Sequence, residues 1–143
     1  MNKALLVGIN KYPAPNELNG CVNDVTDMAK FLVADCNFVK SDIRMLTDER
    51  ATKNAIMDRL AWLLSGLRAG DRIFFHYSGH GAEFPIRNVQ GDVTAVHDVI
   101  CPVNFDWSAE MPFSTLILNL CFLPYLMELS VYGCQIHAIP VVY

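Results

Sequence analysis

A bulky apolar run that ends in a histidine between two glycines constrains the fold of this chain more than any other feature. Residues 73–77, Ile-Phe-Phe-His-Tyr, have the composition of a buried strand. The run continues into Ser78-Gly79-His80-Gly81, where the glycines let the backbone turn sharply and approach a ligand closely. The pattern predicts that His80 is presented at the carboxyl end of a central strand. In open α/β sheets, ligands bind at that edge.

A histidine in this position suits proton-transfer chemistry, because imidazole gains and loses a proton near neutral pH. The alternative is a histidine that is only hydrogen-bonded within a strand-end turn. Gly81 follows His80 and is predicted to offer its backbone N–H to a developing oxyanion, since glycine permits close approach.

The rest of the chain alternates between strand and helix patterns. The pattern predicts short strands at residues 4–9 and 43–46. It predicts an extended segment, interrupted by a proline, at residues 99–105. Apolar residues recur at helical spacing over 22–33 and 56–67, and Thr52 is placed to cap the second helix. This alternation predicts an α/β fold with a mostly parallel sheet and helices on both faces.

Composition limits the classes of function. A formal net charge of -4 argues against nucleic acid as a partner. The five cysteines are odd in number and irregularly spaced, so reduced thiols in a cytoplasmic protein are expected. The apolar run at the amino terminus, residues 4–9, is shorter than a signal-peptide core and fits a first strand better.

A change in composition near Glu110 divides the chain into a predicted domain, residues 1–110, and an apolar tail, residues 111–143. The tail contains no Lys, Arg or Asp. Residues 113–127 are largely apolar but fall short of the roughly 20 apolar residues that a membrane-spanning helix needs. Membrane binding is therefore not expected. A tether formed by residues 111–127 stays open as a third hypothesis, which cell fractionation would test.

Four segments, in order along the chain, resemble one protein family. They are Ala4-Leu-Leu-Val-Gly-Ile-Asn10, Leu18-Asn-Gly-Cys-Val-Asn-Asp24, His76-Tyr-Ser-Gly-His-Gly81 and Asp98-Val-Ile-Cys-Pro-Val-Asn-Phe105. Together they are similar to the metacaspases and their bacterial relatives, which are cysteine endopeptidases of the C14 type. The resemblance extends from about residue 3 to residue 110.

The resemblance implies a caspase-hemoglobinase-like α/β sandwich that cleaves proteins or peptides after Arg or Lys. It implies no required cofactor, although calcium frequently activates such enzymes. His80 matches the catalytic histidine of the family. Cys21, Asp24 and Ser78 match residues lining the pocket for the basic side chain, and Asp98 matches a calcium-coordinating position.

The family's nucleophile lies in an Asp-Ser-Cys-His-Ser-Gly-like motif on the strand after Pro-Val-Asn-Phe. This chain has no such motif, so the fold is expected to be incomplete toward the carboxyl terminus. Cys134 is a candidate nucleophile because it follows His80 by 54 residues, close to the spacing of about 50 found in caspases. Cys21 is a second candidate, since a helix N-terminus lowers the pKa of a thiol.

The sequence leaves two functions open. The first is a cysteine endopeptidase with a Cys–His dyad, of which His80 is the clearly present half. The second is a catalytically inactive caspase-like module that binds partners, or a truncated fragment. The missing Asp-Ser-Cys-His segment is the feature that separates them.

Overall fold

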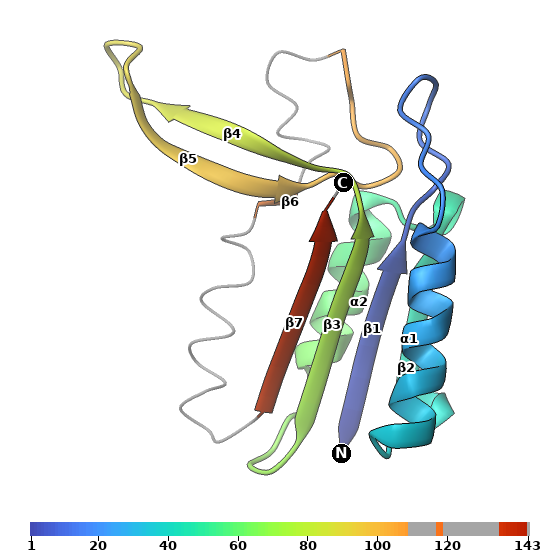
Figure 1. Cartoon of the computed structure of the whole chain (residues 1–143). Helices are drawn as coiled ribbons and strands as arrows, with labels where there is room; N and C mark the ends of the chain where they lie inside the picture. Colours follow the sequence, from blue (N-terminus) through green and yellow to red (C-terminus); the bar gives the residue numbers. More distant parts are fainter. Residues whose placement is uncertain (109–116, 119–134, 143) are drawn as a thin grey trace.

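The computed structural model describes residues 1–108, 117–118 and 135–142. Its centre is a four-stranded parallel sheet with strand order β2-β1-β3-β7. The strands are β1 (Asn2–Gly8), β2 (Ile43–Thr47), β3 (Arg72–Gly79) and β7 (Gln135–Val142). The prediction of an α/β fold built on a parallel sheet is confirmed (Figure 1).

Two helices cover opposite faces of this sheet, α1 (Cys21–Asp35) and α2 (Lys53–Leu64) (Figure 1). Successive side chains of a strand point to opposite faces, and β1 is buried on both. One core cluster joins β1 to α2 and the other joins β1 to α1. The first includes Leu5, Val7, Ile56, Leu60 and Leu63, and the second Ala4, Leu6, Val25 and Leu32. Two short 3-10 helices, η1 (Lys40–Asp42) and η2 (Asp48–Arg50), flank β2.

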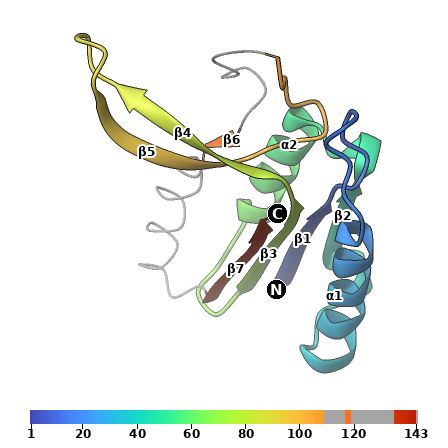
Figure 2. The ribbon, with the colours of Figure 1, turned by 45° about the horizontal axis from the view of Figure 1, so that its top comes forward.

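A second, antiparallel sheet follows β3 and was not predicted. It consists of β4 (Gly81–Arg87), β5 (Val93–Ile100) and β6 (Ile117–Leu118) in that order. The β4–β5 hairpin extends away from the parallel sheet (Figure 2).

The predicted extended segment over 99–105 is therefore correct only for its first two residues. Pro102 has no N–H to give to a ladder. The Phe105 N–H instead donates to the Pro102 carbonyl across 3.0 Å, which closes a turn.

Strand β7 lies within the predicted apolar tail and pairs with β3 along its whole length, from Arg72↔Gln135 to Gly79↔Val142. Part of the tail therefore belongs to the main sheet, while the predicted boundary near Glu110 stays a prediction. Within the described residues, no helix combines the length and apolar character needed to cross a membrane. The segment of the membrane-tether hypothesis, residues 111–127, lies outside the described residues except for β6.

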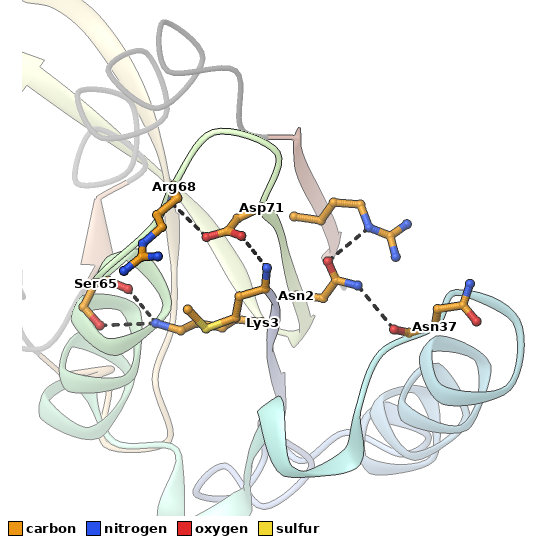
Figure 3. Close-up of polar contacts among 8 residues, drawn as sticks. Asn2, Lys3, Asn37, Ser65, Arg68 and Asp71 are labelled. Atoms are coloured by element: carbon orange, nitrogen blue, oxygen red, sulfur yellow. Dashed lines mark hydrogen bonds and ion pairs between the residues drawn. The ribbon is translucent and has the colours of Figure 1, made fainter.

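The amino-end edge of the sheet is held by buried polar contacts (Figure 3). The Lys3 ammonium donates to the carbonyls of Trp62 and Ser65 at 3.0 and 2.6 Å, and so satisfies the last turn of α2. The Asp71 carboxylate contacts the Met1 amino group and accepts the Arg68 N–H at 2.8 Å. These contacts lie at the opposite end of β3 from His80.

Candidate active site

The structure places His80 directly between β3 and β4, at the carboxyl end of the parallel sheet, where its side chain is half-buried. Its Nε2 lies 2.7 Å from the backbone oxygen of Asn16. A carbonyl oxygen can only accept a hydrogen bond, so Nε2 carries a proton in this contact. In the neutral ring, Nδ1 then holds the lone pair that a general base uses.

Two aromatic rings flank the imidazole. The Tyr12 ring lies 4.7 Å from the His80 ring between centroids, and the Trp107 ring lies 5.3 Å away, edge-on. Phe105 contacts Trp107 in turn, at 4.9 Å. The imidazole is thus packed on two sides, while Trp107 itself keeps 39% of its surface exposed. The ring orientation is set by packing as well as by the bond to Asn16.

The backbone of His80 is held by a pair of buried tyrosines. Its N–H lies 3.0 Å from the Tyr12 hydroxyl oxygen, and its carbonyl accepts from the Tyr77 hydroxyl at 2.7 Å. The two hydroxyls lie 2.9 Å apart, and both contact the Cys101 carbonyl. A side chain on Gly79 would place its Cβ 2.6 Å from the Tyr12 oxygen and 2.7 Å from that of Tyr77. Only glycine fits at this position.

The three residues predicted to line the basic pocket come together between β3 and the first turn of α1. Ser78 is fully buried and donates its hydroxyl to Asp24 Oδ2 at 2.7 Å. The same hydroxyl lies beside the Cys21 thiol, whose pKa it lowers. Cys21 opens α1 and is itself fully buried. The three side chains are therefore neighbours, and their role as the lining of a pocket for a basic side chain stays a prediction.

The expectation that the pKa of Cys21 is lowered is wrong, because the pKa of this thiol is raised overall. Burial raises the pKa of this thiol, and the nearby carboxylates of Asp24 and Asp48 raise it further. The contribution of the Ser78 hydroxyl does not outweigh them. A buried thiol beside negative charge is a poor nucleophile, because the thiolate is the reactive form. These observations fit a pocket wall better than an attacking group.

No individual role is predicted from the sequence for several residues that build this edge. Asn10 Oδ1 accepts the N–H of Cys21 at 2.9 Å, and the Asp48 carboxylate accepts the N–H of Asn10 at 2.9 Å. Asn104 Oδ1 accepts the N–H of Lys53 at 3.0 Å. Each contact joins segments far apart in the sequence. The signal that could have found them is a polar side chain directly after a strand, where parallel strands gather their loops.

Gly81 opens β4 opposite Ile100 and is half-buried. Its predicted role as an oxyanion donor stays a prediction.

Asp98 lies in β5 directly opposite Glu83, and both side chains are exposed. Calcium takes about 6–8 oxygen ligands, and two facing carboxylates supply only part of such a shell. Asp92 lies in the hairpin turn, and Asp106 accepts from Ser108 at 2.7 Å. The described residues contain no group of three or more candidate metal ligands. They do not make a complete calcium site, and calcium activation stays a prediction.

Cys134 lies outside the described residues. The next residue, Gln135, opens β7 opposite Arg72, at the amino end of β3, whereas His80 follows its carboxyl end. The predicted role of Cys134 as nucleophile stays a prediction. Among the described residues, Cys21, Cys36 and Cys101 are free thiols.

Comparison with known proteins agrees with the sequence resemblance. The model of the metacaspase, peptidase C14 domain matches residues 2–139, and so continues past Glu110, where the resemblance is expected to stop. Metacaspase-1 of Scheffersomyces stipitis is 44% identical over 116 residues, covering 76% of this chain and 28% of that protein. Metacaspase-1B of Aspergillus terreus is 38% identical over 110 residues, covering 72% of this chain and 29% of that protein.

A solved structure of a protein from Geobacter sulfurreducens superposes with a TM-score of 0.69. The superposition covers 99% of this chain and 50% of the Geobacter protein, at 20% sequence identity. It therefore supports the fold alone. The chain spans less than a third of the length of the two metacaspases named above. The family match covers nearly the whole chain, and the fold is the one expected. The chain belongs to the metacaspase, peptidase C14 family, a family of cysteine peptidases.

Proposed function

We propose that this chain is the histidine-bearing part of a cysteine endopeptidase domain that cleaves proteins or peptides after Arg or Lys. The observation that carries the proposal is the 2.7 Å contact between His80 Nε2 and the Asn16 carbonyl at the ligand-binding edge of the sheet. It favours the tautomer with the proton on Nε2, in which the lone pair of the neutral ring is on Nδ1.

His80 would act first as a base and then as an acid. Nδ1 takes the proton of a cysteine thiol, and the resulting thiolate attacks the carbonyl carbon of the scissile bond. The imidazolium then gives the proton to the leaving amine. The Asn16 carbonyl supports the charged ring because it accepts the Nε2–H bond in both protonation states.

The side chains predicted to line the pocket include the negative charge that a basic side chain requires. Asp24 and Asp48 both act electrostatically on the Cys21 thiol, so their negative fields overlap there. The Asp24 carboxylate is oriented by Ser78, which lies near the end of β3, two residues before His80. A guanidinium or ammonium group would form charge-assisted hydrogen bonds with this carboxylate. We therefore assign specificity for Arg or Lys to Asp24.

We infer from the position of β7 where a nucleophilic thiol would meet His80. β7 is parallel to β3, and its last residue, Val142, pairs with Gly79, the residue before His80. A thiol presented directly beyond the carboxyl end of this strand would lie beside the imidazole. The chain has Pro140-Val-Val142 where β7 reaches this edge, without a cysteine. Because the sequence contains no Asp-Ser-Cys-His-like motif, we expect this polypeptide to bind basic peptides but not to cleave them.

Binding of a basic peptide tests the pocket directly. Acetyl-arginine amide should perturb the NMR signals of Asp24, Ser78 and His80, while the uncharged isostere acetyl-citrulline amide should not. Asp24→Asn should weaken binding by about tenfold or more, the usual cost of losing a charge-assisted hydrogen bond. The matched control is Asp27→Asn, an exposed carboxylate on the same helix that pairs with Lys30. Equal binding by both variants would exclude the proposed role of Asp24.

A second function, the inactive module, is favoured by the absence of an Asp-Ser-Cys-His-like motif from the sequence. Assays with calcium and fluorogenic peptides ending in Arg or Lys separate the two. We expect no turnover above background for the unaltered chain. Turnover that disappears in Cys134→Ala would establish Cys134 as the nucleophile and overturn this expectation.

A further inference from the structure

We propose that Tyr12 is a positioning residue for His80: its hydroxyl fixes the backbone of the histidine, and its loop carries the carbonyl that sets the tautomer of the ring. This inference rests on the proposed function of His80 as a base. Tyr12 lies 68 residues before His80 and is 3% exposed, and no motif in the sequence connects the two.

The direction of the hydrogen bonds at the Tyr12 oxygen follows from its partners. The His80 N–H can only donate, so the Tyr12 oxygen accepts at 3.0 Å. The Cys101 carbonyl can only accept, so the Tyr12 hydroxyl donates its one proton there, at 2.7 Å. Burial raises the pKa of the phenol, so this proton stays in place at physiological pH. The oxygen therefore ties the end of β3 to the segment that follows β5.

The same residue also anchors the loop that reaches the other side of the imidazole. The Tyr12 N–H donates to the Asn10 carbonyl at 3.0 Å, and the Asn16 N–H donates to the Pro13 carbonyl at 2.9 Å. These bonds form a compact loop between a fixed phenol and the Asn16 carbonyl, which holds His80 Nε2. The Tyr12 ring packs against the imidazole from within this loop. Tyr12 thus connects the main chain of His80 to the acceptor of its side chain.

Tyr77 provides a matched control within the same network. It is also a buried tyrosine, and its hydroxyl donates to the His80 carbonyl at 2.7 Å. That carbonyl has a second donor, the N–H of Cys101, at 3.0 Å. Loss of the Tyr77 hydroxyl therefore leaves the His80 carbonyl bonded. It removes one neighbour of the Tyr12 hydroxyl, 2.9 Å away, but leaves the bonds of Tyr12 to the His80 N–H and the Cys101 carbonyl in place. Both Tyr→Phe changes remove one oxygen, but only Tyr12→Phe should release the imidazole.

The experiment is an ¹⁵N NMR measurement of the His80 ring at a pH where the imidazole is neutral. In the unaltered chain we expect the Nε2–H tautomer to dominate. In Tyr12→Phe the ratio of the two tautomers should shift toward Nδ1–H by about tenfold, since a buried hydrogen bond is lost. Tyr77→Phe should keep the original ratio. An unchanged ratio in Tyr12→Phe, or an equal change in both variants, overturns the proposal.

A measurement on the unaltered chain covers the case in which Tyr12→Phe does not fold. The His80 amide should exchange its hydrogen with solvent at least about 100-fold more slowly than unbonded loop amides, because its acceptor is buried. Exchange as fast as in those amides would overturn the proposal. Neither readout uses substrate. Failure of arginine binding with an intact tautomer result would therefore refute only the proposed function.

Discussion

The side-chain oxygen of Asn10 lies 2.9 Å from the backbone nitrogen of Cys21 and caps a helix that begins eleven residues later in the chain. The residue at the N-cap position itself, Gly20, has no side chain to offer. The first turn of α1 leaves several N–H groups without helical partners, and Asn10 satisfies one of them from the loop after β1. This contact positions the part of the helix that carries Asp24.

Asn10→Ala should lower the free energy of unfolding by about 1–2 kcal/mol, the usual cost of losing a helix cap. Urea denaturation monitored by circular dichroism would measure it. Asn23→Ala, an exposed change in the same helix, is the control and should stay within about 0.5 kcal/mol. Equal effects of the two changes would show that the cap contributes nothing.

Gly79→Ala should destabilise the fold by about 3 kcal/mol, because the added methyl group would collide with two phenol oxygens. The cost should fall by about 1 kcal/mol when the change is made in a Tyr12→Phe background, since neighbouring changes couple. Thermal and urea unfolding of the four proteins in this cycle would give the coupling. If the two changes in the free energy of unfolding were strictly additive, the predicted collision would be contradicted.

Thr52→Ala should destabilise the protein by about 1 kcal/mol. The Thr52 hydroxyl accepts the N–H of Ala55 at 3.3 Å and caps α2. Thr52→Ser keeps the hydroxyl and should retain most of the stability. Thr26→Ala removes a hydroxyl that donates back to the Val22 carbonyl inside α1, and we expect it to be neutral or slightly stabilising. If Thr26→Ala lowered the stability as much as Thr52→Ala, the effect at Thr52 could not be assigned to capping of α2.

The thiol of Cys101 should make the protein less stable in alkali. Burial raises its pKa from 9.0 to about 12. Between these values the unfolded chain loses the proton and the folded chain keeps it, so the free energy of unfolding falls as the pH rises. One group contributes at most about 1.4 kcal/mol per pH unit.

Cys101→Ala should remove this contribution and give a shallower decline above pH 9. Urea unfolding of both proteins at several alkaline pH values would measure the difference. Burial also raises the pKa values of Tyr12 and Tyr77, and the Cys101 thiol adds to both shifts. The difference between the two proteins therefore reports the thiol together with its effect on these two phenols. If the free energy of unfolding fell equally steeply with pH in both proteins, the predicted contribution of the Cys101 thiol would be contradicted.

The elements that could be predicted from the sequence are those with a strong local pattern. Helix α2 follows directly from its periodic leucines and the cap at Thr52, and Leu60 and Leu63 are buried as expected. For α1 the pattern is less reliable, because its spacing places Val33 on the buried face and yet this residue is 44% exposed. The position of His80 follows from the apolar run before it and the glycines around it.

The hairpin and the surroundings of His80 could not be predicted in the same way. Pro85 in β4 and the largely exposed residues of β5 obscure the alternation that marks a half-buried strand. Tyr12 and Asn16 reach His80 from a loop whose local sequence indicates only turns. Such contacts depend on which loops meet at the sheet edge, and this is decided by strand order. The order β2-β1-β3-β7 joins β3 to a strand more than 50 residues away.

Strand β7 also protects the edge of β3 from pairing with strands of other molecules. It covers β3, whose apolar residues 73–77 would otherwise present a row of unpaired N–H and C=O groups. Pro140 lies within β7 opposite Tyr77 and, lacking an N–H, makes this outer strand a poor template for a further one. Removing β7 would therefore expose a strand suited to intermolecular β-pairing, so the strand that completes the sheet also guards against aggregation.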